Sequence, residues 1–171
     1  TKKLDDGSTF TGTMQRGDDD GDTMVPHQGK RVLPTGEVHE GTFDAATGRL
    51  QKGRIESARM IYEGDFFTSP RLFLREGTAT LKDGSVVLQG TFDPATQTLR
   101  FGVKRDVRVG VVSKGHFVRS PDNHLRLLVG RTEFAHGATA FVGAYNPTDG
   151  AWVEGHQVAK DSSVIVGKFS P

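Results

Sequence analysis

Apolar and aromatic residues recur on one side of short extended stretches, each centred on a glycine. The pattern is clearest at Leu88-Gln89-Gly90-Thr91-Phe92, where an apolar residue stands two positions before the glycine and an aromatic residue two positions after it. Because successive side chains of a β-strand alternate between its faces, these three positions share one face. Glycine weakens the interior of a strand. Its repeated use here predicts that a neighbouring strand lies against it.

The stretch occurs seven times, with its glycines 23 to 29 residues apart. An aromatic residue follows two positions later in each copy except the first, which has Met14, and an apolar residue precedes except at His39 and Ser113. We interpret residues 1–171 as one array of about seven repeats. The anchoring glycines are Gly12, Gly41, Gly64, Gly90, Gly115, Gly143 and Gly167.

Each repeat carries a second glycine, preceded by its own apolar residue, which predicts a second strand. The segments that join the two strands begin with Asp or Asn, as in Asp44-Ala45-Ala46-Thr47-Gly48 and Asp93-Pro94-Ala95-Thr96-Gln97, and this is turn chemistry. Short pairs that allow positive φ separate the repeats and predict tight antiparallel connections. They are Asp6-Gly7, Thr35-Gly36, Asp83-Gly84, His136-Gly137 and Asp161-Ser162.

Composition favours a thin β architecture. Hydrophobic residues make up 35% of the chain and 22 of its 171 residues are glycine, and no helical periodicity is found. We therefore predict an all-β fold, an elongated single-layer antiparallel meander of tandem β-hairpins. The 22 basic residues nearly balance the 21 acidic ones, which gives no case for a nucleic-acid partner. With no cysteine, the chain is expected in a reducing, cytoplasmic compartment. Both ends fall inside repeating material, as expected of a fragment of a longer protein.

The repeat unit resembles the MORN repeat (membrane occupation and recognition nexus). The matching stretches are Tyr62-Glu63-Gly64-Asp65-Phe66, Leu88-Gln89-Gly90-Thr91-Phe92 and Phe141-Val142-Gly143-Ala144-Tyr145. The second strand departs from the family's His-Gly-x-Gly pattern and keeps one glycine, as in Lys52-Gly53. The resemblance implies a non-catalytic scaffold or protein-interaction module in an intracellular assembly, cytoskeletal or ciliary in kind. Its partners would be other proteins, including further copies of the chain.

A row of aromatic residues supplies the candidates for partner binding. A single-layer sheet cannot bury both of its faces, so the row either stacks internally across the glycines or forms a patch that another molecule covers. Both interpretations remain open at the level of sequence. The candidate residues are Phe43, Tyr62, Phe66, Phe92, Phe117, Phe141 and Tyr145.

Two further functions are alternatives. Lys104, Arg105 and Arg108 form the most basic local cluster and are candidates for binding anionic lipid, such as phosphoinositide, although Asp106 lies among them. The chain could also be the regulatory part of an enzyme whose catalytic domain lies outside it.

No motif for enzymatic chemistry is found, and we predict no catalytic, cofactor-binding or metal-binding residue. The acidic run Asp18–Asp22 lacks the spacing of a calcium loop, because its twelfth position is Gly29 rather than a glutamate. Whether this loop binds a cation stays open. The histidines never stand at the spacing of zinc ligands, and we expect the ring of His39 to fill an apolar position of its repeat.

Overall fold

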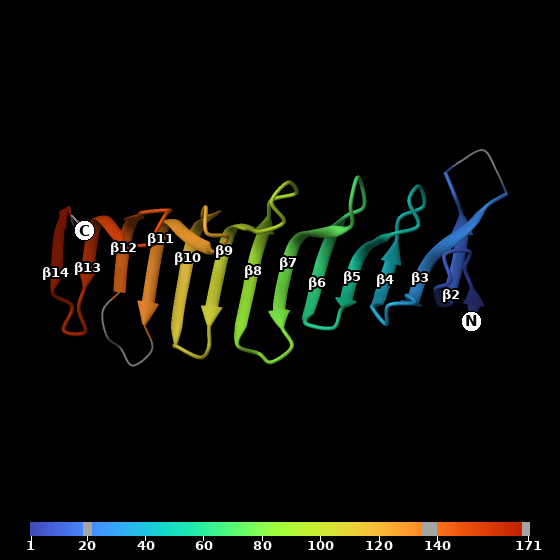
Figure 1. The fold of residues 1–171 in the computed structure, drawn as a ribbon, viewed down its shortest axis with the longest axis horizontal. Helices are drawn as coiled ribbons and strands as arrows, with labels where there is room; N and C mark the ends of the chain where they lie inside the picture. The colour runs from blue at the N-terminus through green and yellow to red at the C-terminus, as the bar shows by residue number, and fades with distance from the viewer. Residues whose placement is uncertain (19–21, 135–139, 169–171) are drawn as a thin grey trace. The chain divides into compact units, whose positions relative to one another are not determined.

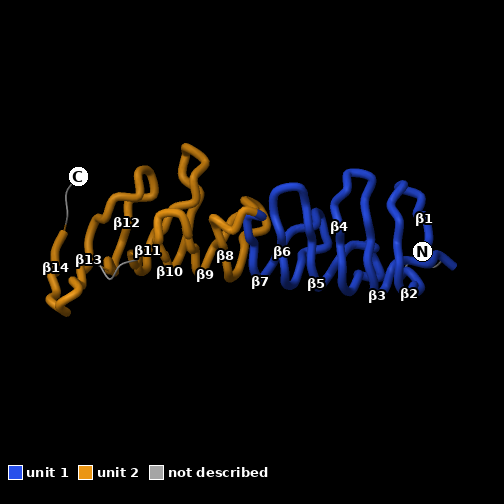
Figure 2. The backbone as a smooth tube through the Cα atoms, turned by 90° about the horizontal axis from the view of Figure 1, so that it is seen from below, with its two compact units in different colours: residues 1–82 blue, residues 83–171 orange. Residues whose placement is uncertain are grey.

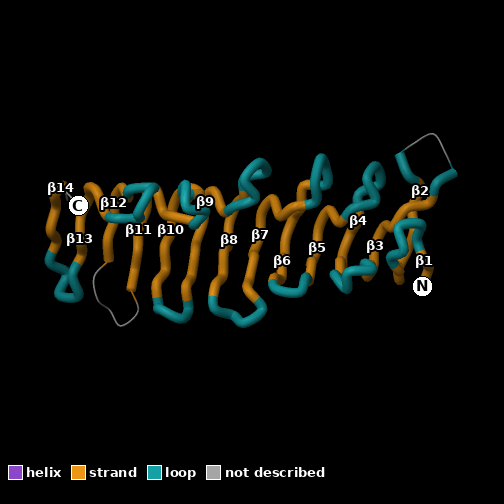
Figure 3. The backbone as a smooth tube through the Cα atoms, in the orientation of Figure 1, coloured by secondary structure: helices purple, strands orange, loops and turns teal. Residues whose placement is uncertain are grey.

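The computed structural model describes residues 1–18, 22–134 and 140–168. These residues form antiparallel strands joined by loops and turns, and no helix is found among them (Figure 3). The chain divides into two compact units, residues 1–82 and residues 83–171 (Figure 2). Within each unit the strands pair in chain order, so the predicted all-β, antiparallel meander of hairpins is confirmed. The described part of the chain holds no helix long and apolar enough to cross a membrane.

Unit 1 is a meander of hairpins in which each strand pairs with the next one along the chain (Figure 1). Its strands are β1 (Lys2–Lys3), β2 (Thr9–Arg16), β3 (Met24–Val32), β4 (Val38–Phe43), β5 (Leu50–Glu56), β6 (Met60–Phe67) and β7 (Phe73–Leu81).

Unit 2 repeats this arrangement. Its strands are β8 (Val86–Phe92), β9 (Leu99–Asp106), β10 (Val111–Arg119), β11 (Leu125–Phe134), β12 (Ala140–Tyr145), β13 (Trp152–Val158) and β14 (Val164–Lys168).

Within each unit the repeated glycines stand opposite one another on neighbouring strands and form a row, which we call the glycine ladder. In unit 2, Gly90 pairs with Gly102, and the row ends where Gly155 pairs with Gly167. A Cβ atom added at Gly90 would lie 2.1 Å from the carbonyl oxygen of Phe101 and 2.8 Å from the Cα of Gly102. The prediction that a neighbouring strand lies against the repeated glycine therefore agrees with the geometry.

The ladder divides the side chains of each strand between two faces. On the first strand of each hairpin the inner face carries the residues two positions before and two positions after the ladder glycine. On the second strand it carries the residues three positions before and two positions after, and the immediate neighbours of each glycine lie on the outer face. A β-bulge follows the glycine in each hairpin and sets the aromatic residue opposite the apolar residue of the second strand. Phe43 thus pairs with Leu50, and Phe92 with Leu99. All four side chains are buried, so these pairs form the repeating core on the inner face.

The turns follow the predicted chemistry. In the loop after β4 the backbone amide of Thr47 donates to Asp44 Oδ1 at 2.8 Å, so the polar residue that opens the loop also caps it. Between strands, Gly7 has φ +81° and its amide donates to the carbonyl oxygen of Leu4 at 2.9 Å. The predicted turn at His136-Gly137 lies outside the described residues.

Candidate functional site

The inner face of unit 2 contains a hollow where the apolar row of the repeat is interrupted. Two positions before the ladder glycines, unit 1 places large side chains such as Phe10, His39 and Tyr62. At the matching position of β10 in unit 2 stands Ser113, which pairs with Thr132 on β11. Because these two side chains are small, they leave a hollow of about 340 Å³.

Aromatic side chains from successive strands form one wall of this hollow. Phe134 at the end of β11 packs edge-on against Phe141 of β12, with ring centroids 6.0 Å apart, and Phe141 lies 4.7 Å from the ring of Trp152 on β13. The Tyr145 hydroxyl donates to the carbonyl oxygen of Phe141 at 3.2 Å, and burial raises the pKa of Tyr145. The wall is therefore apolar and held by contacts between rings.

Polar groups lie next to the aromatic wall, in and beside the hollow. The hydroxyl oxygens of Ser113 and Thr132 are 3.4 Å apart. Lys104 stands opposite Ser113 on β9, on the same face, and its Nζ donates to the carbonyl oxygen of Leu125 at 3.5 Å. Among the described residues, no carboxylate forms an ion pair with Lys104. Lys104 does not itself line the hollow, but its ammonium group lies at the carbonyl oxygen of Leu125, which does. A hollow with one aromatic wall and this ammonium group nearby suits a ligand in which an apolar group is next to a negatively charged one.

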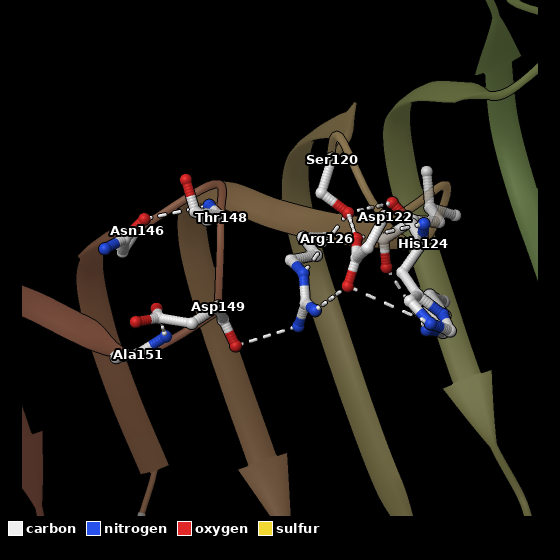
Figure 4. A network of polar contacts seen from close by, with 10 residues as sticks. Ser120, Asp122, His124, Arg126, Asn146, Thr148, Asp149 and Ala151 are labelled. Atoms are coloured by element: carbon white, nitrogen blue, oxygen red, sulfur yellow. Dashed lines mark hydrogen bonds and ion pairs between the residues drawn. The ribbon is translucent and has the colours of Figure 1, made fainter.

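Arg126 fixes the rim of the hollow by joining two loops (Figure 4). Its Nη2 donates to Asp122 Oδ2 at 2.7 Å and its Nε to the Ser120 hydroxyl at 3.3 Å, both in the loop before β11. Its Nη1 donates to the carbonyl oxygen of Asp149 at 2.8 Å, in the loop before β13. The Ser120 hydroxyl also donates to Asp122. With its donors engaged in this way, Arg126 holds the loops in place and is not a free cation.

Unit 1 contains the same arrangement of arginine contacts, beside a hollow of about 300 Å³ that Asp6, Arg31 and Gly48 help to line. Arg31 on β3 donates from Nε to the Ser8 hydroxyl at 2.9 Å, from Nη2 to Asp6, and from Nη1 to the carbonyl oxygen of Gly48 at 3.1 Å. The acceptors are again a serine, an aspartate of the same turn, and a carbonyl group in the loop of the next hairpin. This repetition indicates that the arginine contacts are structural.

The network predicts an acid-sensitive contribution to stability in unit 2. Hydrogen bonds from the Ser120 hydroxyl and then from Arg126 lower the pKa of Asp122 to about 2, below its usual 3.8. Since the folded-state pKa is depressed, the stabilisation is present above about pH 4 and is lost as the pH falls towards about 2. We expect Asp122→Asn to be less stable than wild type at about pH 6, and the difference to vanish near pH 2, in denaturant titrations. A difference that does not change with pH would contradict this assignment.

The aromatic residues proposed from sequence as partner-binding residues separate into two groups. Five have buried side chains that pack into the inner-face core, where a partner would meet little of their surface; they are Phe43, Phe66, Phe92, Phe117 and Tyr145. Tyr62 and Phe141 are half-buried. Of these two, Phe141 lies in the wall of the hollow, and Tyr62 packs against Phe73 in unit 1.

The basic cluster read from sequence does not form one patch. Lys104 lies on the inner face, whereas Arg105 is its immediate neighbour in strand β9 and lies on the other face. Arg108 is in the following turn, where its Nη2 donates to Asp83 Oδ2 at 2.6 Å. The three cations therefore do not converge on one surface.

The remaining sequence candidates can be placed only in part. Asp18 and Asp22 are described, but residues 19–21 of the acidic run lie outside the described residues. Within the part of the chain that is described, no group of three or more His, Cys, Asp or Glu side chains is arranged to hold a metal ion. His39 is 5% exposed, and its Nε2 lies 2.5 Å from Glu37 Oε1. Its ring fills the core position expected of it.

Ser113 was noticeable in the sequence as a break in the apolar row, but the hollow was not predicted. Thr132 becomes its neighbour only through the register that pairs Gly115 with Gly130. Aligning the second glycine of each repeat would have placed the two small residues side by side. Phe134 carries no repeat signal, because it lies beyond the ladder at the end of a ten-residue strand.

No protein-family model matches the sequence, and no curated protein matches it either. The resemblance to the MORN repeat therefore remains a prediction that rests on the repeat residues.

Proposed function

We propose that the chain is a non-catalytic protein-interaction module whose hollow in unit 2 receives an apolar side chain of a partner protein. The observation that supports this most directly is the interruption of the apolar row at Ser113 and Thr132, which leaves about 340 Å³ beside an aromatic wall. Pockets of this kind take up the anchor residues that dominate the affinity of protein interfaces.

Lys104 narrows the chemistry of the partner. Its ammonium group stands beside the hollow without a carboxylate in ion-pair range among the described residues, so a partner carboxylate next to the apolar anchor would complete the site. A partner segment with an aromatic or branched side chain beside Asp, Glu or a C-terminal carboxylate fits this arrangement. Association with a cytoskeletal or ciliary assembly stays a prediction from the resemblance.

No contact in the described structure favours the two alternatives. The cations proposed for phosphoinositide binding lie on different faces or are already paired, as with Arg108 and Asp83. A regulatory role beside a catalytic domain remains a prediction about sequence outside this chain.

Filling the hollow tests the proposal. Ser113→Phe supplies the large apolar residue that the repeat predicts at this position and is expected to occupy the space beside Thr132 and Phe141. As a probe we choose N-acetylphenylalanine, which carries a ring and a carboxylate, in an NMR titration of the full chain. We expect saturable shifts at the amides of Ser113 and Thr132 in the wild type. In Ser113→Phe these shifts should be reduced roughly tenfold at equal probe concentration, because the ring occupies the site.

His39→Phe is the matched control, since it makes the same kind of replacement at the other break in the row, in unit 1. Binding of the probe should be unchanged in this variant. Equal binding by Ser113→Phe and wild type, or no saturable shift in the wild type, would contradict the proposal.

A further inference from the structure

Unit 2 contains a second cavity, which shares no lining residue with the hollow. It measures about 580 Å³, within the size range of sites for small organic ligands. We call it the β10 groove, because the end of β10 contributes most to its lining, together with residues from the loop after β8, from β9 and from β11. Its charged, titratable and apolar lining residues include Asp93, Arg100, His116, Arg119, Leu128 and Val129.

Two arginines bring positive charge to the β10 groove. Arg100 is the extra residue of the bulge between β8 and β9, so it has no residue opposite it on β8. Arg119 is the last residue of β10, and its Nη1 donates to Asn123 Oδ1, a neutral acceptor that leaves the positive charge uncompensated. Among the described residues, neither guanidinium group has a carboxylate within ion-pair distance.

Asp93 carries the one carboxylate among the described residues that line the groove, and its own loop uses it. Asp93 Oδ1 accepts hydrogen bonds from the backbone amides of Ala95 at 2.9 Å and Thr96 at 2.8 Å. The backbone amide of Thr96 and, more weakly, the charge of Arg100 lower the pKa of Asp93. The lining therefore holds two guanidinium groups against one carboxylate, and an excess of positive charge beside a cavity favours an anionic ligand.

Unit 1 has a groove at the corresponding place in its repeat, but its charges are paired. Asp65 directly follows a ladder glycine, as His116 does in unit 2. The Asp65 carboxylate lies 3.8 Å from Lys52 Nζ and 3.9 Å from Arg75 Nη2, and all three residues line a cavity of about 360 Å³. His116 supplies no carboxylate, and its ring instead lies against that of Phe101, with centroids 4.8 Å apart. The cations of the β10 groove therefore lack the counter-charge that unit 1 has.

The chemistry of the lining suits a phosphate ester. Arginine binds phosphate through paired N–H donors, and the imidazole N–H of His116 adds a further donor. A phosphate monoester carries close to two negative charges at neutral pH, which matches two arginines better than a single carboxylate does. On the apolar side, Leu128 is the extra residue of the bulge between β10 and β11, and Val129 is 49% exposed. A hydrophobic group on the ester would cover these two side chains.

We propose that the β10 groove binds a phosphate monoester that carries a hydrophobic group. Arg100, Arg119 and His116 bind the phosphate, and the hydrophobic group lies against Leu128 and Val129. A free small molecule and a phosphorylated side chain of a partner protein present the same ester chemistry. Because the groove and the hollow have no lining residue in common, the proposal is independent of the function proposed above.

The test is an NMR titration of the full chain with phenyl phosphate at about pH 7 and low salt. We expect saturable shifts at the amides of His116 and Val129. Inorganic phosphate should shift the same amides but bind roughly threefold more weakly or worse, because it lacks the hydrophobic group. Ser113→Phe should leave these shifts unchanged, which separates the groove from the hollow. No saturable shift at millimolar phenyl phosphate, equal binding of inorganic phosphate, or loss of the shifts in Ser113→Phe would overturn the proposal.

Two variants change the charge of the groove. His116→Asp introduces the carboxylate that unit 1 has at this position and should weaken phenyl phosphate binding roughly tenfold or more, because it repels the phosphate and pairs with the arginines. Arg100→Gln removes one exposed cation that has no ion pair to lose, so the fold should be retained, and binding should weaken roughly threefold to tenfold. Arg75→Gln, in the groove of unit 1, is the matched control and should leave binding unchanged. Wild-type affinity in Arg100→Gln, or weaker binding in Arg75→Gln, would overturn the assignment.

A peptide comparison distinguishes the sources of the ester. The probes are Ala-Ala-phosphotyrosine-Ala-Ala with blocked ends and the same peptide without phosphate. Tighter binding of the phosphorylated peptide than of phenyl phosphate supports a partner protein as the source, and tighter binding of phenyl phosphate supports a free ester. Equal binding of the two peptides would overturn the phosphate site. Displacement of phenyl phosphate by vesicles of phosphatidylcholine and phosphatidylinositol phosphate, but not by the phosphorylated peptide, would assign the groove to a membrane surface and would also overturn it.

Discussion

Gly90→Ala is expected to unfold much of unit 2 at denaturant concentrations where the wild type is folded. The new Cβ would meet the carbonyl oxygen of Phe101 at 2.1 Å, and φ at this position is +144°, which side chains rarely adopt. Since the obstacle is backbone on the paired strand, relief requires β8 and β9 to separate locally. We expect a loss of roughly 3 to 5 kcal/mol in the free energy of unfolding. The fluorescence of Trp152, the only tryptophan and a residue of unit 2, reports the transition.

Gly84→Ala is the matched control in the same unit. Gly84 also has positive φ, +71°, but an added Cβ meets nothing within 4 Å. Gly84→Ala should lower the free energy of unfolding by about 1 to 2 kcal/mol, because alanine is disfavoured in the left-handed conformation. If the two substitutions shift the transition equally, close packing across the ladder is not what requires glycine at position 90.

Phe43→Ala should destabilise unit 1 by roughly 3 to 5 kcal/mol, the range of large-to-small changes in a packed core. The Phe43 side chain is 2% exposed, and its ring centroid lies 5.5 Å from that of Phe10 in an edge-to-face contact. Replacing Phe43 with alanine leaves a cavity between Phe10 and Leu50. Hydrogen exchange of the β4 and β5 amides, measured across a denaturant series, gives the local free energy.

Phe101→Ala provides the comparison for an exposed aromatic residue. The Phe101 side chain is 52% exposed on the outer face and touches the ring of His116. Its removal should cost less than about 1 kcal/mol. If Phe43→Ala lowers the free energy of unfolding only slightly and Phe101→Ala lowers it strongly, the assignment of Phe43 to the core and of Phe101 to the surface is wrong.

Much of the fold could be predicted from sequence because the repeat is local. Each strand contains its own glycine, and each turn contains residues suited to positive φ or to capping, so hairpins and chain-order pairing follow from short segments. Internal stacking of the aromatic row across the glycines was one of two interpretations, and the buried Phe43 agrees with it. The bulge moves the aromatic residue opposite the leucine of the second strand.

The candidate site was harder to predict, because it depends on the absence of large side chains at two paired positions. A hollow arises when small residues on neighbouring strands coincide, and Ser113 meets Thr132 only through the ladder register. Lys104 and Arg105 lie on opposite faces of the sheet, because successive side chains alternate along a strand. Counting basic residues in a sequence window does not take this alternation into account. The contacts of Arg126 join loops more than 20 residues apart, as in its bond to Asp149, and no local pattern encodes them.

The glycine ladder also restricts how the chain can misfold. A slip of one residue between neighbouring strands would place a side chain such as Gln89 where the native register has a glycine, and in the native register a Cβ at Gly102 would lie 2.0 Å from a carbonyl oxygen. Most wrong registers are therefore penalised as soon as a hairpin closes, and the short loops let hairpins close early. The alignments that escape this penalty bring one ladder glycine against another, a whole hairpin out of place. Errors in folding should accordingly be exchanges of complete hairpins, within one chain or between two.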